Sequence, residues 1–259
     1  MFFYFDNIKT IIHAPPKNAC TTVKDYLWKQ KRVIHPGLPH DHPHADTMLK
    51  YLVERNDYTG SIKQLVGKIE KGYSLYIIMR DPYSRFYSAL YQKFIAHHPT
   101  GNKNLLNPRT PGQRRAGEFY NWYAQEYKKD ISEITNKMLI DYHCGDYNEI
   151  TDLHFLPVLY HPLYELLPSL ENVKIIKVDL NLNKNLNSLF YKPYKLEEMN
   201  TSEYKIKYTD SFDEAKFLNE CTDDKRCIEE SMYFRERVQK RFSIDFEIYG
   251  DLSKIYNDI

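Results

Sequence analysis

Residues 9–22 read KTIIHAPPKNACTT and indicate the fold class. Residues 9–14 (KTIIHA) form a short apolar run, which predicts a buried strand. The prolines and polar residues that follow predict a loop, and the apolar spacing of residues 21–31 predicts a helix. A strand, a loop and a helix in this order begin an α/β unit.

Two further apolar runs continue this pattern along the chain. Residues 73–79 (YSLYIIM) and 173–179 (VKIIKVD) predict a second and a third buried strand. We expect loops over 99–117 and 141–156. We expect helices over roughly 46–56, 61–71, 82–97, 116–128, 131–140, 157–170 (with a break at Pro162), 183–191 and 226–242. Because strands alternate with helices, the expected fold class is α/β, with a central parallel sheet flanked by helices.

The bulk composition fits one globular domain over residues 1–259. Hydrophobic residues make up 42% and charged residues 27%, which is ordinary for a soluble protein. The formal net charge of +1 provides no global basic field, so neither a nucleic acid nor a membrane surface is expected as a partner. No run is long enough to span a bilayer and no signal peptide is visible, so we expect a soluble, cytoplasmic protein.

The cysteines do not follow a zinc-binding pattern. Cys20, Cys144, Cys221 and Cys227 include no CxxC pair. We expect reduced thiols, as in a cytosolic protein. The alternative is a Cys221–Cys227 bridge, which would need an oxidising compartment.

The loop at residues 16–22 (PKNACTT) has the features of an anion site. A loop between a strand and a helix start exposes unpaired backbone N–H groups, and the helix dipole also favours an anion there. Lys17 would add a positive charge, and Thr21 and Thr22 would add hydroxyl donors. The loop lacks the glycines of the GxxxxGK[ST] nucleotide-binding pattern. The alternative is an ordinary turn in which Thr21 caps the helix.

A second motif follows the second predicted strand. Arg80 lies at the carboxyl end of this strand, where open α/β sheets bind ligands. Ser88 comes eight residues later, about two helical turns on, so both side chains could hold one phosphate. The alternative for Arg80 is an ion pair with Asp81. For Arg85 a structural salt bridge is the preferred interpretation.

Together these motifs resemble those of the sulfotransferases that use 3′-phosphoadenosine-5′-phosphosulfate (PAPS), and especially the carbohydrate sulfotransferase branch. PKNACTT (16–22) is similar to the family's 5′-phosphosulfate loop. RDPYSRFYSALY (80–91) is similar to its 3′-phosphate motif, including the spacing from arginine to serine. Three weaker similarities, DLHFLP (152–157), VKIIKVD (173–179) and DFEIYG (245–250), extend the resemblance over about residues 8–250.

The resemblance implies a P-loop-like three-layer fold and a role for each motif residue. Lys17 would bind the sulfuryl oxygens and stabilise the leaving phosphate. Arg80 and Ser88 would hold the 3′-phosphate, which distinguishes PAPS from ATP. The residues that would wrap the 5′-phosphate with their backbone amides are Asn18, Ala19, Cys20, Thr21 and Thr22.

The same resemblance implies transfer without a metal and, as acceptor, a carbohydrate hydroxyl. Tyrosine residues, lipids and small alcohols stay open as acceptors, and the sequence leaves the oligomeric state open. The product would be adenosine 3′,5′-bisphosphate (PAP).

A histidine is expected to act as general base, because its pKa lies near neutrality. We rank His44 first, because it directly precedes the predicted helix at 46–56, and His42 and His40 next. His35 in the same loop and His154 further along are alternatives, and each of these histidines could instead have no chemical role. The spacing of His40, His42 and His44 could also indicate a metal, but no further ligands support one.

Two rival functions remain. A P-loop kinase would need magnesium and would turn over ATP, but the chain lacks the glycines of that motif. A nucleotide- or glycan-binding protein without transfer activity would bind PAP and sulfate nothing. A local basic stretch could clamp the nucleotide, attract an acidic glycan or simply be solvated; it comprises Lys103, Arg109, Arg114 and Arg115.

Overall fold

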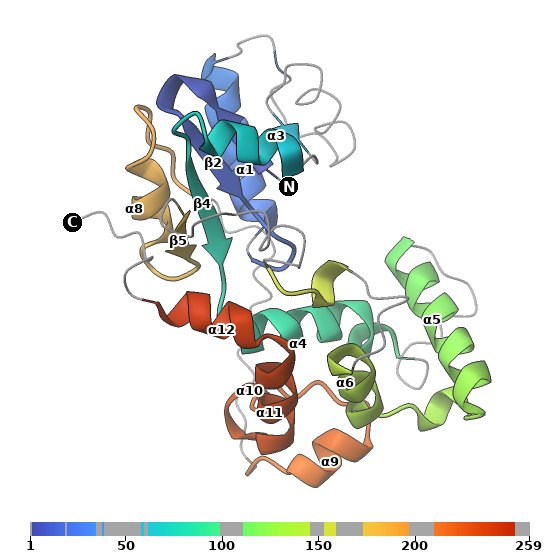
Figure 1. Cartoon of the computed structure of the whole chain (residues 1–259). Helices are drawn as coiled ribbons and strands as arrows, with labels where there is room; N and C mark the ends of the chain where they lie inside the picture. Colours follow the sequence, from blue (N-terminus) through green and yellow to red (C-terminus); the bar gives the residue numbers. More distant parts are fainter. Residues whose placement is uncertain are drawn as a thin grey trace. The chain divides into compact units, whose positions relative to one another are not determined.

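The computed structural model describes residues 2–18, 20–34, 38, 58–59, 62–98, 111–145, 153–158, 173–196 and 210–251. These fall into two compact units, which we describe separately (Figure 1). The first unit comprises residues 1–81, 157–204 and 244–259, and the second comprises 82–156 and 205–243. The single domain over residues 1–259 stays a prediction.

The first unit contains a five-stranded sheet with the strand order β3-β1-β2-β4-β5 (Figure 1). Its strands are β1 (Phe2–Phe5), β2 (Thr10–His13), β3 (Tyr58–Thr59), β4 (Ser74–Met79) and β5 (Val173–Lys177). The neighbours β2, β4 and β5 run parallel, which confirms the three predicted strands and the mostly parallel sheet. The sequence did not predict β1 and β3, and β1 pairs antiparallel with both β2 and β3.

Helices cover both faces of this sheet. Successive strand residues point to opposite faces, so Ile11 and Ile12 belong to different hydrophobic clusters. One face packs against α1 (Cys20–Ile34) and α8 (Leu182–Asn187), through Val23 and Leu186 among others. The other packs against α3 (Ile62–Ile69) and α12 (Ser243–Gly250), through Leu65 and Ile248. The three-layer α/β fold expected from the sequence is therefore confirmed.

The second unit contains helices and, among its described residues, no strand (Figure 1). Its α-helices are α4 (Pro82–Lys93), α5 (Pro111–Tyr127), α6 (Asn136–Cys144), α9 (Glu214–Asn219), α10 (Cys227–Glu230) and α11 (Met232–Arg241). The 3₁₀ helices are η2 (Ile95–His97), η4 (Ile131–Glu133) and η5 (Leu153–Phe155). Aromatic rings dominate its core, and the rings of His143 and Phe155 stack with centroids 4.0 Å apart. Stacked and edge-on ring pairs stabilise a folded protein by more than the burial of their apolar area alone.

Several predicted helix boundaries are wrong. The predicted loop over 99–117 ends early, because α5 begins at Pro111, a residue that favours the first turn of a helix. The single helix predicted over 226–242 is two helices, because Ser231 caps α11 with its hydroxyl on the N–H of Phe234. The predicted helix over 46–56, and most of that over 157–170, lie outside the described residues.

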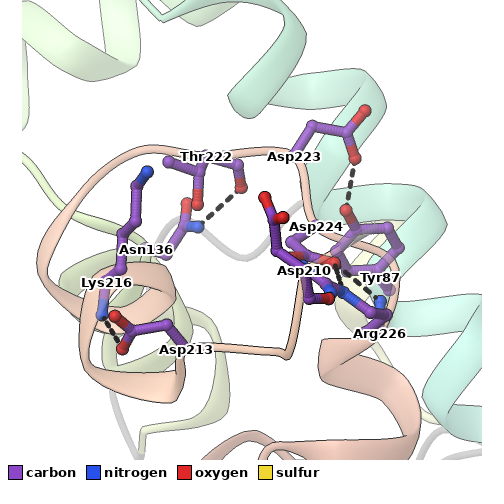
Figure 2. Close-up of polar contacts among 9 residues, drawn as sticks. All are labelled: Tyr87, Asn136, Asp210, Asp213, Lys216, Thr222, Asp223, Asp224 and Arg226. Carbon is purple, nitrogen blue, oxygen red and sulfur yellow. Dashed lines mark hydrogen bonds and ion pairs between the residues drawn. The ribbon is translucent and has the colours of Figure 1, made fainter. Parts of the chain in front are cut away.

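Side-chain hydrogen bonds fasten residues 210–226 to the helices of the second unit (Figure 2). The Tyr87 hydroxyl of α4 donates to the carboxylate of Asp223, and the Asn136 amide of α6 donates to the carbonyl of Thr222 at 2.8 Å. The segment therefore joins two helices that the sequence separates by many residues.

The cysteines whose side chains the structure describes, Cys144, Cys221 and Cys227, are free thiols, so the Cys221–Cys227 bridge does not form in it. Burial raises the pKa of Cys144 and of Cys221 to about 12. Both thiols are therefore protonated at neutral pH, and neither has the character of a nucleophile.

Candidate functional site

The loop between β2 and α1 makes a tight turn at the carboxyl end of β2. The strand ends at His13 and the helix begins at Cys20. The N–H of Asn18 donates to the carbonyl of Pro15 at 3.3 Å, and Lys17 adopts a left-handed backbone conformation with φ of 64°. This conformation costs about 1 kcal/mol in a residue that is not glycine. The sequence thus places a lysine at a strained turn, a feature that clusters at ligand sites.

The structure describes the remaining loop residues, 19–22, only in part. Thr21 is the second residue of α1, so the interpretation of Thr21 as its N-cap is wrong. Thr21 is exposed and Thr22 is half-buried. Ala19 lies outside the described residues, as does the side chain of Cys20.

Asn18 joins the two predicted motifs directly. Its side chain is fully buried, and its Oδ1 accepts the backbone N–H of Arg80 at 2.6 Å. Its Nδ2 donates to the carbonyl of Pro16 at 3.2 Å, so both ends of the amide are used. Because a buried polar group that loses its partner is costly, this bond holds the Lys17 loop against the end of β4. The sequence pattern assigned Asn18 only a backbone role, so its bridging side chain was missed.

The guanidinium group of Arg80 has no hydrogen-bond or ion-pair partner among the described residues, although the charge of Asp81 acts on it. Arg80 follows β4 and is half-buried. The predicted alternative, an Arg80–Asp81 ion pair, is not among the contacts of the described residues, and Asp81 acts on Arg80 as a nearby charge. Burial lowers the pKa of Arg80, an effect that the nearby Asp81 opposes. A partly desolvated guanidinium with five unused donors favours a bound phosphate or carboxylate.

Arg85, in contrast, has structural contacts, while the salt bridge expected for it stays a prediction. It is 2% exposed, and it donates to the carbonyl of Leu156. Its guanidinium carbon lies 5.4 Å from the centre of the Phe242 ring. These contacts place Arg85 in the core of the second unit. Ser88 lies on α4 in the same unit and is half-buried, and its phosphate role stays a prediction.

The histidine predictions cannot be tested with the described residues. His35, His40, His42 and His44 lie outside them. His154 lies on η5 in the second unit, where it is half-buried and has interaction partners. The general base therefore stays a prediction.

The basic stretch and the metal alternative are also only partly described. Lys103, Arg109 and the side chain of Arg115 lie outside the described residues, whereas Arg114 is exposed on α5. The described part of the chain contains no cluster of three or more potential metal ligands. Within the same ranges, no helix is both long enough and apolar enough to cross a membrane.

A contact missed by sequence reasoning connects the two downstream motifs. Asp245, the first residue of DFEIYG, is 1% exposed, and its carboxylate accepts the N–H of Val158 at 2.8 and 3.0 Å. Val158 directly follows DLHFLP, of which Asp152 lies outside the described residues. The acidic residue at the start of the last motif is therefore a structural anchor of α12 on the first unit.

A cavity of about 310 Å³ lies elsewhere, in the second unit, and is lined by residues including His98, Thr135 and Cys221. It contains none of the residues singled out by the motifs. Volume alone is a weaker indication of a site than a strained loop lysine and a partly desolvated arginine at the carboxyl ends of neighbouring parallel strands. The sheet edge at Lys17 and Arg80 is therefore the stronger candidate.

Comparisons with known proteins show the family of the chain. The family model described as "Sulfotransferase family" matches residues 1–251. No significant match was found among curated proteins or among solved structures. The matched region includes the Lys17 loop, the Arg80 motif and the downstream motifs, and it covers nearly all of the 259 residues. The chain belongs to the sulfotransferase family.

Proposed function

We propose that this protein transfers the sulfuryl group of PAPS to an acceptor hydroxyl, with a carbohydrate as the acceptor class. Membership of the family supports sulfuryl transfer in general. The observation that carries the choice of donor is the hydrogen bond from the Arg80 N–H to Asn18. It holds the Lys17 loop and Arg80 together at the carboxyl ends of two neighbouring parallel strands, so a ligand with two separate phosphate groups can contact both.

Each phosphate of the donor is assigned to one of these motifs. The 5′-phosphosulfate binds to Lys17 and to the amides of residues 18–22, at the start of α1, where the helix dipole favours an anion. The 3′-phosphate binds to Arg80, whose guanidinium has no hydrogen-bond or ion-pair partner among the described residues. Ser88 is assigned to the same phosphate by its position in the sequence motif alone. ATP lacks a 3′-phosphate, so it would leave Arg80 without a ligand.

The proposed reaction is an in-line displacement at sulfur. The acceptor oxygen forms a bond to sulfur as the bond from sulfur to the 5′-phosphate oxygen breaks, and PAP leaves. His44, with His42 as the alternative, takes the acceptor proton, and Lys17 stabilises the charge that develops on the leaving phosphate. Substituting each histidine in turn by alanine would identify the base, because only the base variant should lose turnover while PAP affinity is kept.

A transfer assay tests this function. The protein is incubated with PAPS carrying labelled sulfate and, separately, with oligosaccharides, tyrosine-containing peptides, lipids and small alcohols, in the presence of EDTA. We expect label on an oligosaccharide and release of PAP in equal amount. Label on another class would correct the acceptor, and PAP binding without transfer to any class would favour the binding-protein alternative.

The kinase alternative is tested in the same assay by replacing PAPS with ATP and adding magnesium. Turnover of ATP with magnesium, together with no release of PAP from PAPS, would overturn the proposed function. Lys17→Ala should lower transfer in the assay about 100-fold or more without loss of the fold, and it serves as the control for a contaminating activity.

A further inference from the structure

Lys177 lies at the carboxyl edge of the sheet, beside the residue that precedes Arg80. It is the last residue of β5, and it pairs with Met79, the residue that directly precedes Arg80. The N–H of Val178 donates to the carbonyl of Met79 at 2.8 Å, so the pairing holds to the end of both strands. Neighbouring strands lie about 5 Å apart and paired residues share a face of the sheet, so the Lys177 side chain leaves the sheet on the face of Met79, against which α12 packs.

The side chain of Lys177 is held by Tyr249, which lies on α12. Its Nζ lies 4.3 Å from the centre of the Tyr249 ring. Among the described residues this ring is the only partner recorded for Lys177. A ring face attracts an ammonium group but accepts no strong hydrogen bond from it. The contact therefore orients Lys177 and leaves its donors available to an anion.

The charges around Tyr249 show why a second cation matters here. Burial raises the pKa of the Tyr249 hydroxyl, Asp81 and Asp179 raise it further, and Arg80 lowers it. Two carboxylates and the Arg80 guanidinium thus act on the same ring. A phosphate bound at Arg80 would be repelled by Asp81, whose charge also acts on Arg80, and a second cation would oppose this repulsion.

We propose that Lys177, oriented by the ring of Tyr249, is a second cation for the phosphate that binds to Arg80. This inference rests on the proposed function, because it takes that phosphate to be the 3′-phosphate of PAPS. A phosphate monoester carries between one and two negative charges at pH 7, more than one arginine can neutralise. The arginine supplies a planar pair of donors and the lysine a compact charge, and the two complement each other. Lys177 then contributes to the preference for nucleotides that carry a 3′-phosphate.

The test is calorimetric titration of Lys177→Gln with PAP and with 5′-AMP. Loss of one charge-assisted contact should weaken PAP binding about tenfold and leave 5′-AMP binding unchanged. Lys174→Gln is the matched control, because Lys174 is a half-buried lysine on the same strand, three residues before the carboxyl end. This control should bind both nucleotides as the unsubstituted protein does.

Variants of Tyr249 test the orienting contact. Tyr249→Phe keeps the ring and should bind PAP normally, whereas Tyr249→Leu should weaken PAP binding to the level of Lys177→Gln. Combining Tyr249→Leu with Lys177→Gln should add little, because both remove the same contact. Thermal unfolding of every variant shows whether the fold is kept.

The outcomes separate this inference from the proposed function. If the unsubstituted protein shows no preference for PAP over 5′-AMP, the proposed function fails. If that preference exists and Lys177→Gln keeps it in full, only the role of Lys177 is overturned. An equal loss for PAP and 5′-AMP would also contradict it, because the lysine would then act on a group that both nucleotides share.

Discussion

Arg80 and Arg85 are five positions apart in one motif, and the two units of the molecule use them in opposite ways. At the sheet edge of the first unit, Arg80 is half-buried and its guanidinium has no hydrogen-bond or ion-pair partner among the described residues. In the helical core of the second unit, Arg85 is buried, bonded to the carbonyl of Leu156 and packed near the Phe242 ring. An arginine whose donors are used by the protein stabilises the fold, whereas one whose donors are unused can bind a ligand.

We expect substitutions at the sheet edge to lower turnover or nucleotide affinity far more than they lower the stability of the fold. The effect on turnover should be largest at Lys17. Lys17→Ala should lower turnover about 100-fold or more, because a charge that stabilises the leaving group is lost. PAP affinity should fall much less. Initial rates with labelled PAPS and titration with PAP measure the two effects, and an equal loss in both would mean that Lys17 only binds.

Arg85 should show the opposite behaviour. Arg85→Leu should lower the free energy of unfolding by about 3 kcal/mol, because it removes a buried side chain and leaves the Leu156 carbonyl without its donor. Arg80→Leu is the matched variant and should change that free energy by less than about 1 kcal/mol. Urea unfolding measures both, and similar losses would remove the distinction between the two arginines.

Substitution of Arg80 should weaken only the binding of nucleotides that carry a 3′-phosphate. Arg80→Gln should weaken PAP binding about 30-fold and leave 5′-AMP binding unchanged, because a charge-assisted pair is lost only with the ligand that carries a 3′-phosphate. Calorimetric titration with both nucleotides measures this. If both affinities stayed at their original values, the assignment of the 3′-phosphate to Arg80 would be wrong.

Asn18 should contribute both to stability and to PAP binding, and we expect its substitution to have the smallest effects of the four. Asn18→Ala should cost about 1 kcal/mol of unfolding free energy, because the part-buried Arg80 N–H loses its acceptor. PAP affinity should fall by a few fold at the same time, since the Lys17 loop is no longer held against Arg80. Asn18→Asp keeps an acceptor for this N–H and serves as the comparison; an unchanged PAP affinity in Asn18→Ala would show that the loop does not need this bond.

The parts of the fold that depend on local pattern could be predicted from the sequence. The strands β2, β4 and β5 were predicted because each is a continuous apolar run that is buried on both faces. The short strand β1 was missed, because its place in the sheet depends on pairing with β2 and β3 rather than on its own sequence. The break at Ser231 was missed although a serine is a known helix-start signal, since the apolar spacing continues across it.

The residues of the candidate site could also be predicted only in part from the sequence. Lys17 and Arg80 could be chosen because each follows a predicted strand directly, where ligands bind in such sheets. The Asn18 bridge, the Asp245 anchor and the Lys177–Tyr249 contact could not, because each joins side chains or backbone groups at least 62 residues apart in the sequence. Only the folded chain brings these partners together.

The proposed PAPS site can be tested by measuring which nucleotides the protein binds without added metal. The unsubstituted protein would be titrated with PAP, 3′-AMP, 5′-AMP and ATP in the presence of EDTA. We expect PAP to bind more tightly than each of the other three, because it alone carries both phosphates that the Lys17 loop and Arg80 are proposed to hold. Tighter binding of ATP, or no binding of any nucleotide, would contradict the account.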